Sequence, residues 1–117
     1  MILPSSQIKV WLYTHAADMR CSYNGLIALT KTKLKENPSS GQLFVFINKR
    51  RNQMKCLYYD RGGYCLWCKR LEQGCFEQKC HSDGKYELTT VELEMLVEGI
   101  ELTAIKKRKR YDKHMPL

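Results

Sequence analysis

Three apolar runs separated by two short polar turns constrain the fold of this chain more than any other feature. The runs cover residues 43–48, 54–60 and 64–71, and the turns are residues 49–52 and 61–63. Such short connections can join only antiparallel neighbours, and glycine in the second turn supplies the positive φ that a tight hairpin needs. The first run begins LFVFI, with no polar alternation, so it predicts a central strand buried on both faces.

The flanking segments predict one further strand and two helices. Residues 8–14 are rich in β-branched and aromatic side chains, which favours a strand. Ser22 is a good N-cap for a helix over residues 22–35, and Thr89 with Glu92 forms a capping box for a helix over residues 90–98. The sequence therefore predicts an α+β fold in which a small antiparallel sheet of about four strands packs with two helices. Residues 74–77 are a candidate for a short strand that follows the three runs, as the fourth in that series.

Length and composition limit the class of protein. With 117 residues and 44% hydrophobic residues, the chain is predicted to form a single folded domain over residues 1–105. Residues 106–117 have no apolar periodicity and are predicted to be a basic flexible tail. We find no signal-peptide pattern and no apolar run near the roughly 18 residues that span a bilayer, so we expect a cytoplasmic protein without membrane contact.

The net charge of +8 is unevenly distributed along the chain. Residues 43–71 carry seven Lys or Arg and one acid, residues 72–105 carry two and eight, and residues 106–117 carry six and one. A basic middle and a basic tail therefore flank an acidic segment. Basic surfaces with aromatic neighbours favour a polyanionic partner such as nucleic acid.

Several segments resemble the small accessory proteins, usually called TnpB, of insertion sequences of the IS66 type. They are DMRCSYNGL (residues 18–26), the stretch from Gly41 to Phe76, and ELTTVELEMLVEGIEL (residues 87–102). The resemblance covers most of the chain in the family's order. It implies a role in transposition beside a separate, larger transposase of the DDE type, but it does not supply a mechanism.

The candidate partners are DNA and the cognate transposase. Phosphate contacts are expected from the basic hairpins and from the tail. The candidate nucleic-acid-binding residues are Lys49, Arg50, Arg51, Lys55, Arg61, Lys69, Arg70, Lys106, Lys107, Arg108, Lys109 and Arg110. Two alternatives remain open, an adaptor that binds the transposase through the acidic residues 87–101, and a regulator that binds single-stranded nucleic acid. The DNA specificity, the transposition step and the oligomeric state are also open.

The cysteines raise the question of a metal site. Cys65 and Cys68 have the spacing of a zinc knuckle, and Cys75, Cys80 and His81 follow. However, Cys65 and Cys68 lie in a predicted strand, where positions three apart point to opposite faces. We therefore predict free thiols, no metal ion and no cofactor.

Four carboxylates could be imagined as a metal-dependent nuclease set, namely Asp18, Asp60, Glu72 and Glu77. Asp18 precedes a helix and Asp60 begins a turn, and both are ordinary positions for aspartate. No nucleophile and base stand at a suggestive spacing either, so the sequence predicts a protein that is not an enzyme.

Overall fold

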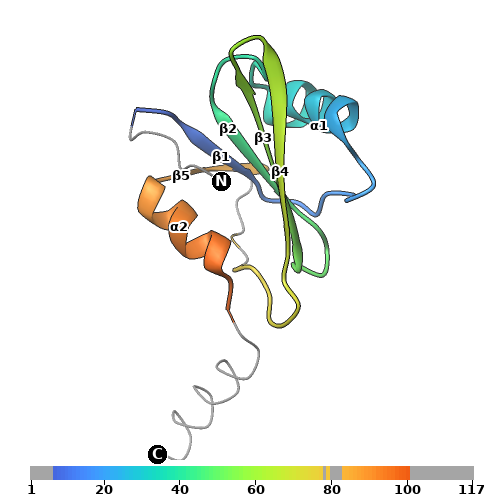
Figure 1. The fold of residues 1–117 in the computed structure, drawn as a ribbon, viewed down its shortest axis with the longest axis vertical. Coiled ribbons are helices and arrows are strands. Elements are labelled where there is room, and N and C mark those ends of the chain that lie inside the picture. The colour runs from blue at the N-terminus through green and yellow to red at the C-terminus, as the bar shows by residue number, and fades with distance from the viewer. Residues whose placement is uncertain (1–6, 78, 80–82, 101–117) are drawn as a thin grey trace, which may run out of the picture.

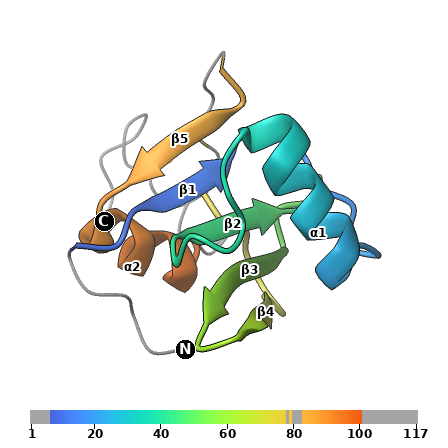
Figure 2. The ribbon, with the colours of Figure 1, turned by 90° about the horizontal axis from the view of Figure 1, so that it is seen from above.

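The computed structural model describes residues 7–77, 79 and 83–100, and these form a five-stranded sheet with a helix on each face (Figures 1 and 2). The strands are β1 (Val10–Tyr13), β2 (Leu43–Ile47), β3 (Gln53–Asp60), β4 (Gly63–Arg70) and β5 (Lys85–Leu88). The helices are α1 (Tyr23–Leu29), continued by the π-helical turn η1 (Thr30–Leu34), and α2 (Thr90–Glu98). The predicted α+β class is confirmed.

The strand order is β4-β3-β2-β1-β5, and the pairing is mostly antiparallel. The meander β2-β3-β4 forms as predicted. The prediction was incomplete in two respects, because β1 is parallel to β2 and β5 is a fifth strand paired with β1. The parallel pair is reached through α1, the kind of long crossover that parallel strands require. Residues 74–77 form no strand, although Cys75 makes an isolated bridge with Ile100.

Strand β2 is buried along its whole length, as its unbroken apolar sequence predicts. Phe44 and Phe46 pack in the layer below α1, together with Leu26 and Leu34. The alternate residues of β2 belong to the opposite layer, with Leu93 and Leu96 of α2. Figure 2 shows the two helices on opposite sides of the sheet. The core is therefore divided by β2 into two layers.

Helix α1 is shorter than the predicted helix at residues 22–35. Ser22 occupies the N-cap position, but its side chain makes no capping hydrogen bond. After Leu29 the helix widens into η1, where the buried Thr30 hydroxyl donates a hydrogen bond to the Leu26 carbonyl at 2.8 Å. Such back-bonding by threonine often distorts helices. Lys35 then ends the turn with a left-handed φ of 55°.

Helix α2 begins at the predicted capping box. The Glu92 amide donates to Thr89 Oγ1 at 3.1 Å, and the Thr89 amide donates to Glu92 Oε1 at 2.9 Å. Leu93 and Leu96 are buried against the sheet, and Gly99 forms the C-cap. These contacts confirm the local prediction, because a capping box and an apolar stripe both depend on neighbours in sequence.

Candidate nucleic-acid interface

The turn between β2 and β3 is held by the side chain of Asn48. Its Oδ1 accepts hydrogen bonds from the amides of Asn52 and Gln53, both at 3.0 Å, and its Nδ2 donates to Asn52 Oδ1 at 2.8 Å. The Arg51 amide donates to the Asn48 carbonyl at 3.0 Å. Residues 49–51 are therefore presented by a closed hydrogen-bond network rather than by a free loop.

Arg51 is the most constrained residue of this turn. Its φ is 59°, in the left-handed region that non-glycine residues rarely adopt. Its carbonyl accepts a hydrogen bond from the amide of the fully buried Phe76 at 2.7 Å. The chain after β4 is thus attached to the turn, which holds the Arg51 backbone in place.

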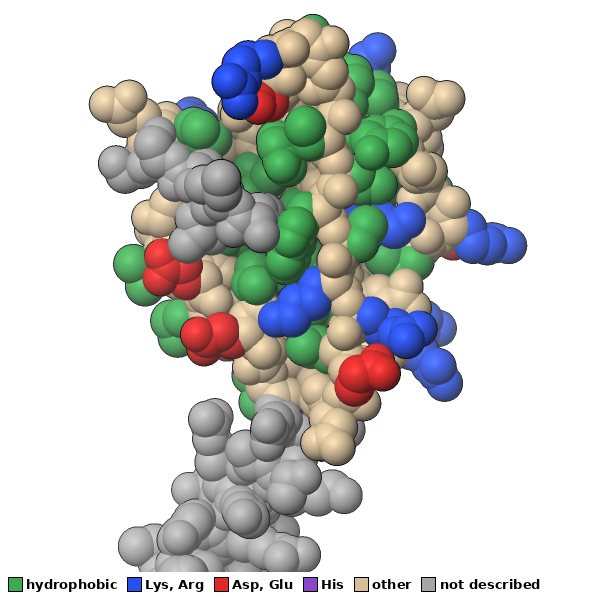
Figure 3. Space-filling model, in the orientation of Figure 1, with side chains coloured by type: hydrophobic (Ala, Val, Ile, Leu, Met, Phe, Trp, Pro, Cys, Tyr) green, Lys and Arg blue, Asp and Glu red, His purple; other side chains and the backbone are tan. Residues whose placement is uncertain are grey.

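Arg70 joins the turn from the adjacent strand, because it pairs with Gln53 at the end of β4. Lys49, Arg50 and Arg70 are exposed, whereas Arg51 is half-buried. We call these four residues the basic end of the sheet. Figure 3 shows Lys and Arg side chains gathered at this end, in the lower right of the view, beside an acidic side chain. Glu72 forms an exposed ion pair with Arg70 at 3.2 Å, which partly neutralises the edge of the cluster.

Two other predicted binding residues are engaged within the protein. Lys55 Nζ donates to the carbonyls of Met19 and Cys21 at 2.8 and 2.7 Å, joining β3 to the segment before α1. Lys69 Nζ donates to the Val97 carbonyl at 2.8 Å, near the C-terminus of α2, where the helix dipole favours a cation. Both ammonium groups therefore hold elements of the fold together.

The remaining predicted residues lie away from the basic end. Arg61 is in the turn between β3 and β4, at the opposite end of a strand about 25 Å long. It is exposed and forms an ion pair with Asp60 at 3.5 Å. Lys106, Lys107, Arg108, Lys109 and Arg110 lie outside the described residues, as does the predicted tail. The structure thus brings together four of the seven central residues and separates Arg61 from them.

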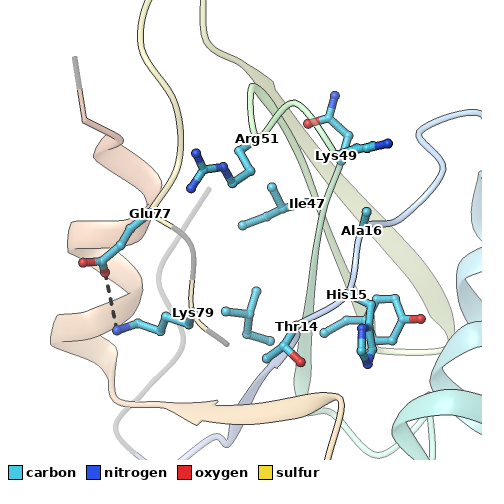
Figure 4. Close-up of a pocket in the computed structure, with 11 residues that line it drawn as sticks. Thr14, His15, Ala16, Ile47, Lys49, Arg51, Glu77 and Lys79 are labelled. Atoms are coloured by element: carbon cyan, nitrogen blue, oxygen red, sulfur yellow. Dashed lines mark ion pairs between the residues drawn. The ribbon is translucent and has the colours of Figure 1, made fainter. Parts of the chain in front are cut away.

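A pocket of about 160 Å³ lies beside the basic end, where the parallel strands β1 and β2 both finish (Figure 4). Arg51 extends toward the segment that carries Glu77 and Lys79, whereas Lys49 extends the other way. Lys79 Nζ lies 3.4 Å from the Glu77 carboxylate and 3.7 Å from that of Glu92. His15 also lines the pocket. The sequence analysis missed His15 and Lys79. His15 reaches the basic end through the parallel pairing of β1 with β2, and the segment of Lys79 reaches it where Phe76 is hydrogen-bonded to Arg51.

The four carboxylates considered for nuclease chemistry do not converge. Each pairs with a cation one or two residues away: Asp18 with Arg20, Asp60 with Arg61, Glu72 with Arg70 and Glu77 with Lys79. Hydrogen bonds from Arg20 lower the pKa of the Asp18 carboxyl to about 2. Local ion pairing accounts for these residues without a shared metal ion.

The cysteines of the suggested knuckle lie on β4, as predicted from strand context. Cys65 is opposite Tyr58 and Cys68 is opposite Lys55, so the two thiols are on different faces of the sheet. Within residues 7–77, 79 and 83–100, no three His, Cys, Asp or Glu side chains are grouped as a metal site would require. Cys80 and His81 lie outside these residues, so the absence of zinc stays a prediction. Burial raises the pKa of the Cys56 thiol to about 12, which makes it unreactive.

These features define a class of protein, a small α+β domain with a rigid cationic end. The chain belongs to the family of IS66 Orf2 like proteins, whose family model matches residues 8–107. This membership confirms the resemblance noted in the sequence and indicates an accessory role in transposition. In the part of the chain that the structure describes, no helix is long and apolar enough to span a membrane.

Two curated relatives are similar over nearly their whole length, and both come from Sinorhizobium fredii. The uncharacterized protein y4jC is 35% identical over 108 residues, which cover 92% of this chain and 92% of the relative. The uncharacterized protein y4hO is 36% identical over 101 residues, covering 86% and 88%. No solved protein structure is significantly similar to the chain.

Proposed function

We propose that this protein is a non-catalytic accessory factor for transposition that binds DNA through the phosphate backbone, using the basic end of the sheet and the basic tail. The observation that carries the proposal is the hydrogen-bonded turn at Asn48, which presents Lys49, Arg50 and Arg51 together. Cations held in advance of binding lose less conformational entropy when they meet phosphates.

The test is the salt dependence of binding to duplex DNA, measured by fluorescence anisotropy. Replacing Lys49 and Arg50 together by alanine should weaken binding and flatten the slope of log affinity against log salt by about 0.9 per lost phosphate contact. Lys33→Ala with Arg61→Ala is the matched control, because it removes one exposed lysine and one exposed arginine outside the basic end. An equal effect of the double variant and of two charges removed elsewhere would contradict a localised interface.

The tail is tested in the same assay by deleting residues 106–117. Since a run of Lys and Arg contacts phosphates without reading bases, the deletion should weaken binding to unrelated sequences equally. The order of preference among those sequences should not change. A change in preference after deletion would assign base contacts to the tail instead.

A second candidate function, binding to the transposase, is favoured by the outer face of α2. Val91 and Met95 are 62% and 68% exposed, the two highest values among the large hydrophobic side chains of the described residues. They are four positions apart and so lie on one helix face, with the exposed Glu94 and Glu98 beside them. A pull-down with the transposase, with and without nuclease, separates the functions. A nuclease-resistant complex that Val91→Ser with Met95→Ser abolishes would support the adaptor.

Binding to single strands is distinguished by comparing a duplex with each of its component strands at one salt concentration. Stacking of bases on aromatic side chains would favour the single strands. Preference for the duplex would support backbone contacts by the basic end, because the duplex has the higher phosphate density.

A further inference from the structure

Arg51 differs from the other cations of the basic end in its surroundings. Arg51 is a half-buried residue, and within the described part of the chain its guanidinium forms no hydrogen bond and no ion pair with a carboxylate. Its backbone is held by two hydrogen bonds. The Arg51 amide donates to the Asn48 carbonyl, and the Arg51 carbonyl accepts from the Phe76 amide. Its donors are therefore not used by the described residues, and an arginine presents five N–H donors in a fork that matches an anion. An arginine fixed in this way is suited to a ligand from outside the chain.

The pocket that Arg51 faces has the size and charge for a small anion. Its volume of about 160 Å³ leaves room for a phosphate group with part of a sugar. Its charged lining residues are Arg51, Lys49, Lys79 and Glu77. Because Glu77 is already paired with Lys79, the lining keeps a net positive charge.

We propose that this pocket binds a phosphate group, with Arg51 as its principal ligand and Lys79 on the opposite wall. The planar guanidinium can donate two parallel hydrogen bonds to phosphate oxygens, which a lysine cannot do. That the phosphate belongs to nucleic acid rests on the proposed DNA-binding function. The pocket itself requires only the phosphate chemistry.

Inorganic phosphate tests the pocket independently of DNA. In amide NMR spectra of the full chain, titration with phosphate should shift the signals of Thr14, His15, Lys49 and Arg51. Arg51→Gln should weaken this binding about tenfold or more, the range expected for losing hydrogen bonds to a charged group. Arg61→Gln, the same change at the exposed arginine on the opposite end of β3, should leave it within about twofold of the unmodified protein, as surface charges are screened.

Two further variants separate ligation from folding. Arg51→Gly suits the left-handed backbone and should fold, yet it should lose phosphate binding as fully as Arg51→Gln. Arg51→Lys keeps the charge without the fork and should recover only part of the affinity. Equal losses in the Arg61 and Arg51 variants, or phosphate shifts spread over the whole basic surface, would overturn the proposal.

The source of the phosphate is identified with one duplex prepared with and without a 5′-phosphate. Tighter binding of the phosphorylated duplex that disappears in Arg51→Gln assigns the pocket to a strand end. Equal binding of the two duplexes, weakened equally by Arg51→Gln, assigns it to an internal phosphate. Binding of inorganic phosphate without binding of either duplex would support the pocket and contradict the DNA-binding function. DNA binding that Arg51→Gln leaves unchanged would support the function and contradict the assignment of Arg51 to nucleic acid.

Discussion

The two turns of the β2-β3-β4 meander are chemically similar and structurally different. Each holds an arginine in the left-handed region, Arg51 with φ 59° and Arg61 with φ 46°. The turn with Arg51 is closed by hydrogen bonds to the Asn48 side chain, and its Arg51 carbonyl accepts a hydrogen bond from the amide of the buried Phe76. The turn with Arg61 is a two-residue hairpin connection between Asp60 and Gly63, and Arg61 is exposed there.

The difference shows that positive charge alone does not define a binding site. Arg61 contributes as much charge as Arg51, but its side chain is 90% exposed beside Asp60, and its charge is screened by salt. Arg51 lies at a pocket, and its backbone is held by hydrogen bonds to Asn48 of the same turn and to Phe76 of the segment after β4. The following predictions compare the two ends of β3, beginning with the largest expected effect.

Phe76→Ala should lower the free energy of unfolding by about 3–5 kcal/mol, the usual range for removing a fully buried phenylalanine. Phe76 is 0% exposed, and its amide donates a hydrogen bond to the Arg51 carbonyl at the basic end. At the other end, Tyr59 is only half-buried and packs edge-on against Tyr64 at 5.0 Å. Urea denaturation should therefore show a clearly smaller loss for Tyr59→Ala. Similar losses would mean that both ends are equally well supported.

Asn48→Ala should cost about 1–3 kcal/mol, because it leaves two backbone amides of the turn without their acceptor. The matched change at the other end is Asp60→Ala, which removes an exposed ion pair and should cost no more than about 1 kcal/mol. Amide hydrogen exchange at Asn52 and Gln53 gives a local measurement. Unchanged protection of these amides in Asn48→Ala would show that the side chain does not close the turn.

The parts of the fold that depend on neighbouring residues could be predicted from the sequence. The meander follows from apolar runs and short turns, and α2 follows from its capping box and apolar stripe. The parallel pairing of β1 with β2 could not be predicted in this way, because its partners are separated by the whole of α1. Strand β5 has only four residues and carries charges at Lys85 and Glu87, which weakens its apolar pattern.

For the candidate site, the sequence likewise predicts the features that are local in sequence and misses those that depend on distant residues. A cluster of Lys and Arg marks the basic end, but the sequence does not show which ammonium groups are engaged within the fold. Lys55 reaches carbonyls more than 30 residues earlier in the chain, and Lys69 reaches the end of α2. The pocket at Arg51 likewise joins three segments that are distant in sequence. Contacts between residues distant in sequence thus decide which cations hold the fold together and which are exposed to a ligand.

The smallest expected effect is also the most direct comparison of the two turns. Arg51→Gly and Arg61→Gly should each raise the free energy of unfolding by up to about 1 kcal/mol, because each relieves a left-handed backbone that costs a residue with a Cβ about 1–2 kcal/mol. The gain should be smaller at Arg51, because this half-buried residue loses more packing contact than the exposed Arg61. If the two turns differ in function as proposed, Arg61→Gly should bind inorganic phosphate like the unmodified protein, whereas Arg51→Gly should not. Thermal unfolding and phosphate titration of the same two preparations provide the test. A loss of phosphate binding in both variants would show that the cations act only as a diffuse field, and the distinction between the two ends of β3 would then fail.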